Sequence, residues 1–220
     1  MLVAVAFPLA AAKAVAAWGP RAAGALVFAL GLASFALSVR RKGGTLVPGF
    51  APWLSGLPLA LPGLAALSGD VRFLQLVPAA IEALLCALFL GSLAGGGSIL
   101  QRAALVLEPF APDFIGPYCR KATLAFAALF AVQAAALTAL ALAAPAPDWA
   151  RDASLLVWAP TLAATALEFI VRKAWFRHYG PGLVDRALRV LLPPEKTAQG
   201  RRSLDYIRKK RVELGMPPPS

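Results

Sequence analysis

Long uninterrupted apolar segments limit what this chain can fold into more than any other feature. A membrane-spanning helix needs about 20 predominantly apolar residues, and six segments of the sequence come close to that length. In hydrocarbon, every backbone N–H and C=O has to be hydrogen-bonded within the protein, which favours helices. We therefore predict an all-α polytopic membrane protein, a bundle of about six transmembrane helices, with spans at about 2–18, 22–39, 46–67, 73–92, 122–143 and 154–171.

The composition agrees with a membrane domain followed by a soluble tail. Only 15% of the 220 residues are charged, against about 25% in soluble domains. Basic residues gather near the end, so we place a transmembrane helical domain at 1–177 and a basic, amphipathic cytoplasmic tail at 178–220. The span at 46–67 is the least regular, because interior prolines remove backbone donors and kink or break a helix, or make it re-entrant. These prolines are Pro48, Pro52, Pro58 and Pro62.

Lysine and arginine are distributed unevenly between the two predicted sides of the membrane. One set of loops, together with the tail, carries 18 of them, whereas the opposite loops carry 3, namely Arg21, Arg72 and Arg151. In membrane proteins the excess of Lys and Arg lies on the cytoplasmic side. Six spans then place both the N- and the C-terminus in the cytoplasm. We predict a multi-pass protein of the bacterial inner (cytoplasmic) membrane.

The formal net charge of +11 lies next to apolar segments. This arrangement suits a lipid bilayer with anionic headgroups better than it suits nucleic acid. One basic stretch of the tail is a candidate site for anionic lipid or for an acidic protein partner, although a solvated helix face has the same pattern. The stretch contains Arg201, Arg202, Arg208, Lys209, Lys210 and Arg211. Nothing in the sequence indicates an oligomeric state.

Polar residues inside predicted spans are candidates for function, because burying them in lipid is costly. Glu82 and Gln133 lie mid-span, and Lys13 lies slightly outside the middle of its span. We predict a site in which Lys13 pairs with Glu82 and Gln133 lies nearby. Such a group is either a buried clamp that sets how the helices assemble or a proton or substrate site. Glu168 and Arg172, four residues apart, are predicted to form a simple ion pair near the interface.

Two further patterns concern packing and the membrane surface. Small residues recur every seven positions at Gly24, Gly31 and Ser38, and again at Gly49, Gly56 and Gly63. Such stripes let helices approach closely in lipid, and they also fit a moving helix pair. The longest internal connection, 93–121, contains an apolar-rich stretch from Ile99 to Phe110. We predict an interfacial helix there, lying on the cytoplasmic leaflet.

Catalytic and metal-binding signatures are missing. Cys86 and Cys119 are predicted to be free thiols, and no cysteine lies near the single histidine, His178. A lone histidine at a membrane interface is typical of a headgroup contact, since no nucleophile or base partner accompanies it. We therefore expect no catalytic residue, no metal and no cofactor.

Several short motifs resemble an uncharacterised family of multi-pass bacterial inner-membrane proteins. The segment 117–123 is similar to the family's Tyr-Cys-Arg-Arg-x-Thr element, and 78–93 matches its Pro-x(10)-Phe-x-x-Ser-Leu run. Pro20-Arg21 and the Glu168/Arg172 pair also match, so that the resemblance covers roughly residues 8–177. The residues of the first element are Tyr118, Cys119, Arg120, Lys121 and Thr123.

The chain also departs from that family. Members usually have Asn where Glu82 stands, Trp near Phe126 and Asn near Gln133, and the basic tail has no counterpart among them. The resemblance implies a lipid-related context, because such proteins are often encoded beside β-ketoacyl synthases, acyl carrier proteins and exporters of aryl-polyene-like lipids. It implies no reaction.

These observations favour a non-enzymatic accessory factor for the handling, assembly or transport of a lipid-linked acyl product. Its expected partners are the lipid bilayer and anionic headgroups, with acyl carrier protein or lipid-pathway enzymes as further candidates. Two alternatives stay open at this point. One is a membrane-embedded acyl-group transferase that uses the 93–121 connection, and the other is a small proton-coupled transporter.

Overall fold

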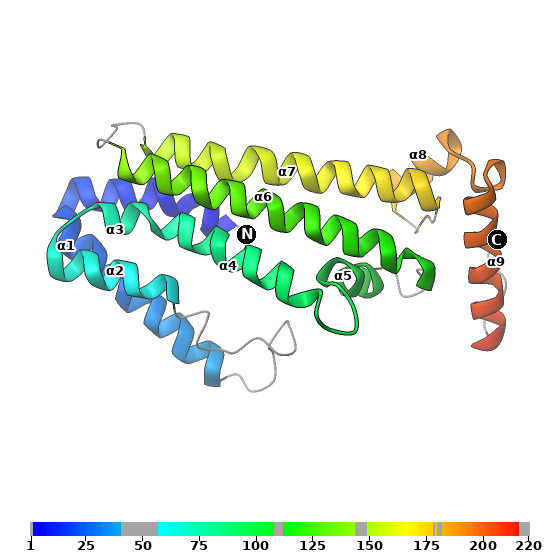
Figure 1. The fold of residues 1–220 in the computed structure, drawn as a ribbon, viewed down its shortest axis with the longest axis horizontal. Helices are drawn as coiled ribbons and strands as arrows, with labels where there is room; N and C mark the ends of the chain where they lie inside the picture. The colour runs from blue at the N-terminus through cyan, green and yellow to red at the C-terminus, as the bar shows by residue number, and fades with distance from the viewer. Residues whose placement is uncertain are drawn as a thin grey trace. The chain divides into compact units, whose positions relative to one another are not determined.

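The computed structural model describes residues 2–40, 57–107, 112–143, 149–177, 179 and 182–215. The regular secondary structure of these residues is helical throughout, as predicted (Figure 1). In chain order the elements are α1 (Leu2–Arg40), α2 (Leu57–Ser68), α3 (Arg72–Gln75), α4 (Val77–Ser92), α5 (Ile99–Leu107), η2 (Asp113–Ile115), α6 (Gly116–Leu142), α7 (Trp149–Phe176), α8 (Leu183–Leu191), η3 (Pro194–Lys196) and α9 (Ala198–Glu213).

Four helical segments in the described part of the chain are long and apolar enough to cross a membrane. The number six is therefore not confirmed, although the membrane class is supported. Three of the predicted spans match crossing segments: 73–92 and 154–171 fall within them, and 122–143 extends one residue beyond Leu142. The four segments are Phe7–Leu37, Arg72–Ser92, Gly116–Leu142 and Trp149–Phe176.

Helix α1, which includes the first crossing segment, contains both of the first two predicted spans. Gly19 interrupts it with a non-helical backbone, φ 77° and ψ 166°. Pro20 follows directly, and its ring cannot supply the N–H that a continuous helix would need there. The chain consequently turns between a first arm, 2–18, and a second arm, 20–40 (Figure 1). The predicted break after residue 18 is confirmed.

The third predicted span is described only in part. Leu57–Ser68 is a helix of 12 residues, which is short of the length of about 20 residues that a full crossing needs. Residues 46–56 of this span, with Pro48 and Pro52, lie outside the described part of the chain. Whether the segment crosses the membrane therefore stays a prediction.

Small residues bring α2 against the second arm of α1. A Cβ added at Gly24 would lie 2.7 Å from the backbone N of Ala66 and 2.8 Å from the carbonyl O of Pro62. Gly31 faces Leu59 equally closely, and Gly63 faces the ring of Phe28. The packing interpretation of the small-residue stripes is thus confirmed at these three glycines. The side chain of Ser38, and residues Gly49 and Gly56, are outside the described part.

The chain divides into two compact units, which we call unit 1 (Met1–Gly91 and Ala125–Thr161) and unit 2 (Ser92–Leu124 and Leu162–Ser220). This division does not follow the predicted boundary between 177 and 178. In unit 1, α4 and α6 are joined by aromatic contacts. The ring centroid of Phe89 lies 5.0 Å from that of Phe130 and 5.9 Å from that of Phe126. Farther along, Ala79 shares a buried cluster with Leu137, so α4 and α6 run antiparallel there.

Unit 2 has its own core around Cys119 and Phe176, which share a buried cluster with Ala104 of α5. The predicted helix in the 93–121 connection is confirmed as α5. Helix α6 begins at Gly116, earlier than the predicted start at residue 122. The family-like element therefore lies on a helix and not in a loop, which corrects that part of the prediction. Backbone hydrogen bonding continues through this segment, because the buried side chains of Cys119 and Thr123 pack inside the unit.

The predicted tail contains two helices, α8 and α9, which pack against the rest of unit 2. The Ser203 hydroxyl of α9 donates to the carbonyl O of Phe176, 2.8 Å away. The Phe114 ring lies 6.3 Å from that of Tyr206, edge to face. Gly200 lies directly against the backbone of Pro194, too close for any larger residue. A fully solvated tail is therefore not what the structure contains.

Candidate functional site

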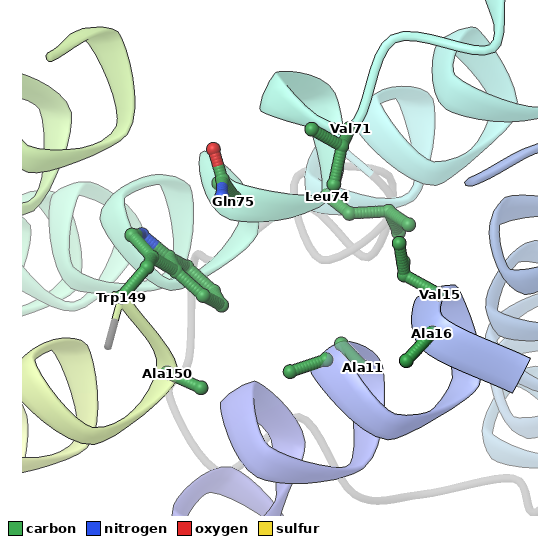
Figure 2. Close-up of a pocket in the computed structure, with 9 residues that line it drawn as sticks. Ala11, Val15, Ala16, Val71, Leu74, Gln75, Trp149 and Ala150 are labelled. Carbon is green, nitrogen blue, oxygen red and sulfur yellow. The ribbon is translucent and has the colours of Figure 1, made fainter. Parts of the chain in front are cut away.

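An apolar pocket in unit 1 is the first candidate site. Its volume is about 190 Å³. Figure 2 shows the Trp149 ring on one side, with Leu74 and Val15 on the other. Three elements meet there because α1 turns back after residue 18, α3 starts after a short connection, and α7 begins at Trp149. The lining residues are Ala11, Ala12, Val15, Ala16, Val71, Leu74, Gln75, Trp149 and Ala150.

The pocket has little polar chemistry. Gln75 is its one hydrogen-bonding side chain apart from Trp149, whose Nε1 is buried without a hydrogen-bond partner. An indole N–H is a donor only, so a bound group would have to offer an acceptor to satisfy it. The described lining contains no Ser, Thr, Cys, His, Asp or Glu. The arrangement suits an alkyl chain that carries an acceptor, and it lacks a nucleophile or a base.

Buried polar residues form a second candidate site, and the structure changes its membership. Lys13 is exposed, and no ion pair joins it to Glu82 among the described residues. The predicted Lys13–Glu82 pair is therefore corrected. The reason is helical geometry: Ala11 is buried against unit 1, and a residue two positions later is rotated by about 200°. The side chain of Lys13 thus points away from the face that packs.

Glu82 and Gln133 remain buried, at 4% and 3% exposure. The amide nitrogen of Gln133 donates to the carbonyl oxygens of Leu156 and Val157, at 2.8 and 3.0 Å. It also lies 3.1 Å from the Thr161 hydroxyl. Gln133 therefore ties α6 to α7, in agreement with the interpretation as a clamp.

Two oxygen atoms in this region have no hydrogen-bond partner, Oε2 of Glu82 and Oε1 of Gln133. Glu82 shares a face of α4 with Phe89, seven residues on, and Gln133 shares a face of α6 with Phe130. The antiparallel register set by the Phe89 and Ala79 contacts places Glu82 at the level of Gln133. These two oxygens are acceptors, and neither has a donor. A protonated Glu82 carboxyl group would supply one.

The predicted pair of Glu168 and Arg172 is confirmed. The guanidinium Nε lies 3.1 Å from Oε1 of the carboxylate, and both side chains are largely buried, at 12% and 15% exposure. The Tyr118 hydroxyl donates to the backbone O of Glu168 at 3.4 Å. This Tyr118 hydrogen bond links the start of α6 to α7 in unit 2.

Another ion pair in unit 2 was not predicted. The Lys173 ammonium lies 3.1 Å from the Asp185 carboxylate, and its side chain is only 2% exposed. The two residues are twelve apart, so no helical spacing connects them in the sequence. The one signal in the sequence was that Asp185 lies within an otherwise apolar and basic stretch, and Lys173 was one of several basic residues that follow the last predicted span.

The connection between α7 and α8 is held by further hydrogen bonds. Arg177 ends α7 with a left-handed φ of 50°, and its guanidinium donates to the Pro193 carbonyl at 2.6 Å. The Tyr179 hydroxyl donates to the Leu192 carbonyl at 2.8 Å. Burial raises the pKa of Tyr179 above its ordinary value, so the hydroxyl stays a donor to higher pH than an exposed tyrosine would. His178 lies outside the described part of the chain.

The remaining predicted site residues are distributed over unit 2. In the family-like element, Arg120 donates to the Leu93 carbonyl at 3.2 Å, and Lys121 is exposed. In the basic stretch, Arg202 lies over the Phe114 ring at 4.4 Å, and Lys210 pairs with Glu213 at 3.5 Å. Part of the stretch is thus occupied by structural contacts. The exposed members are Arg201, Arg202, Arg208, Lys209 and Lys210, whereas Arg211 is half-buried.

The described residues contain no group of three or more His, Cys, Asp or Glu side chains able to hold a metal ion. Comparison of the chain with protein families, with curated proteins and with solved structures finds no match.

Proposed function

We propose that this chain is a membrane protein that binds the acyl chain of a lipid-linked product and helps to handle, assemble or transport it without catalysing a reaction. The observation that carries the proposal is the apolar pocket in unit 1. Its walls are alanine, valine, leucine and tryptophan side chains, and it lies among helices long and apolar enough to cross a membrane.

The size of the pocket supports this ligand class. An apolar cavity of about 150 Å³ stays dry and takes up small apolar molecules, and this pocket has about 190 Å³. It therefore accommodates a segment of an acyl chain and not a whole lipid. The unpartnered Trp149 N–H favours a chain with a carbonyl oxygen. The described lining contains no nucleophile or base, so the pocket itself offers no side chain for acyl transfer.

A test uses the full chain in bilayer nanodiscs with a phospholipid whose acyl chain carries a photoreactive diazirine. We expect cross-links on the pocket-lining peptides around Ala11 and Ala150, and we expect an excess of a soluble acyl thioester to reduce them. Cross-links at Leu30, which is 62% exposed, report ordinary lipid contact and should not be reduced.

Two neighbouring alanines provide a matched pair of variants. Ala16 and Ala17 are both exposed, but only Ala16 lines the pocket. Ala16→Trp should fill the pocket and remove the competable cross-links, whereas Ala17→Trp should leave them. Equal labelling of both variants, or labelling that the thioester does not reduce, would refute the proposed binding.

Proton-coupled transport is a second candidate function, favoured by the buried oxygens of Glu82 and Gln133. A protonated carboxyl group at mid-span is a typical part of a proton relay. In proteoliposomes with an imposed pH gradient, the wild-type chain should then move protons and the Glu82→Gln variant should not. Equal proton flux in both would remove this candidate.

The finer localisation also belongs to the proposal. The distribution of Lys and Arg supports a bacterial inner membrane with both termini in the cytoplasm. Anionic headgroups and an acidic protein such as acyl carrier protein are the proposed partners of the basic stretch.

A further inference from the structure

Helix α8 is unusual in the way its polar and apolar faces are directed. Its one acidic residue, Asp185, points to the rest of unit 2, where it pairs with the buried Lys173. The face opposite Asp185, at helical spacing, carries Leu183, Ala187 and Val190. These apolar side chains are exposed, Leu183 by 82% and Val190 by 79%. The neighbouring Leu191 is 74% exposed.

This orientation is the reverse of that of a surface helix in water. Such a helix turns its apolar stripe to the core and its charged face to the solvent. Here the ion pair with Lys173 holds the polar side of α8 to the unit. Two hydrogen bonds, from Arg177 and from the Tyr179 hydroxyl, hold the backbone just after the end of the helix. The anchored contacts therefore fix the helix with its apolar face outward, which indicates that the medium on that side is not water.

The position of α8 in the chain identifies the medium. It follows α7, a segment able to cross a membrane, which ends at Phe176. Near that end, Trp175 is 66% exposed, and exposed tryptophans are typical of the membrane–water interface. Arg186 borders the apolar face, and Arg189 lies between Arg186 and Asp185 around the helix. Both are exposed, where they complement anionic phosphates.

We propose that α8 is an interfacial helix that lies in an anionic lipid leaflet at the end of α7, with Leu183, Val190 and Leu191 inserted among the acyl chains. Arg186 and Arg189 contact the phosphate layer. The buried ion pair of Lys173 and Asp185 fixes the rotation of α8 about its own axis. This surface is separate from the pocket of unit 1, and the proposal does not depend on acyl binding there.

The experiment uses the full chain in nanodiscs, with a nitroxide spin label at Val190→Cys or at Arg186→Cys. We expect the label at 190 to be accessible to oxygen and protected from a water-soluble nickel chelate, as in a bilayer. The label at 186 should be more accessible to the chelate. The wild-type chain, labelled in the same way, gives the background from Cys86, which is half-buried, and from the buried Cys119.

Lipid composition and a charge variant complete the test. Nanodiscs with phosphatidylglycerol should protect position 190 more than those with phosphatidylcholine alone, and Arg186→Gln with Arg189→Gln should remove that difference. Chelate access at 190 equal to that at 186 in both compositions would overturn the proposal. Protection from oxygen and chelate together would also overturn it, because it would show that a protein or a second copy covers this face.

Discussion

The interpretation of the buried residue Glu82 changes once its neighbours in the structure are known. In the sequence its natural partner was Lys13, the other charged side chain near mid-span. In the structure the polar side chain at the same level of the bundle is Gln133, whose amide nitrogen already donates to α7. Burying an ionised carboxylate with an unpartnered oxygen in such surroundings is costly.

This difference leads to a prediction about three variants. Lys13→Ala should leave the stability of the chain unchanged, and Glu82→Gln, which is neutral and of the same shape, should preserve or raise it. Gln133→Leu should lower it by about 0.6–1.7 kcal/mol, the range for side-chain hydrogen bonds between membrane helices. Unfolding in mixed micelles by titration with a denaturing detergent measures all three. A clear loss of stability in both Lys13→Ala and Glu82→Gln would instead support the predicted ion pair.

At the scale of elements, α8 depends on one buried ion pair with α7. The Lys173 side chain is 2% exposed and that of Asp185 is 13% exposed, so neither charge is well hydrated once its partner is removed. The exposed pair of Lys210 and Glu213 on α9, at 47% and 49% exposure, is a natural comparison. Exposed pairs contribute little because water screens them.

We predict that Asp185→Ala destabilises unit 2 by about 3–5 kcal/mol, since it leaves a buried charge unpaired. The double variant Lys173→Met with Asp185→Leu should recover most of this loss. Glu213→Ala should cost no more than about 0.5 kcal/mol. Limited proteolysis within 182–215, followed over denaturant concentration, measures the opening of α8 and α9. An intact, protected α8 in Asp185→Ala would show that the pair is not its anchor.

The buried Tyr179 hydroxyl adds a pH dependence to the same element. Its pKa is raised by burial, so the folded form retains its proton where the unfolded form, with a pKa of about 10, loses it. Unit 2 should therefore lose stability as the pH rises above about 10. Tyr179→Phe should remove this alkaline loss and cost about 1 kcal/mol at neutral pH. The same proteolysis assay, run at neutral and at alkaline pH, measures this effect. If Tyr179→Phe loses as much stability at alkaline pH as the wild-type chain, the loss belongs to another titrating group.

At the scale of the whole molecule, the number of crossings determines where the termini lie. The described residues provide four segments able to cross, and the first of these is divided at Gly19 into two arms. Residues 46–56 and the short α2 decide whether a further crossing exists. The Lys and Arg distribution favours the arrangement with both termini in the cytoplasm.

The topology can be measured in cells. A cytoplasm-active reporter fused after Ser220 should be active, and one fused near Gly69 should not be. A cysteine at Ser68 should react with an impermeant reagent from outside, whereas one at Gly43 should not. The inverse pattern at these positions would exclude the termini-inside arrangement.

The sequence by itself determined the helical class, the break near Gly19, the α5 helix and the Glu168/Arg172 pair. Each of these depends on interactions within a few residues: apolar length, proline and glycine chemistry, or a spacing of four. The membrane orientation and the proposed lipid partners were also inferred at this level, and they stay predictions.

Only the tertiary structure decided which distant residues meet. Apolar length does not specify how a helix is rotated or how it is aligned with its neighbours. Rotation and register decide the exposure of Lys13, the level shared by Glu82 and Gln133, and the early start of α6. Lys173 of α7 and Asp185 of α8 meet although they are twelve residues apart, and the pocket needs α1, α3 and α7 together. In a sequence so uniformly apolar, many rotations bury similar area, so the few polar contacts and close glycine approaches select among them.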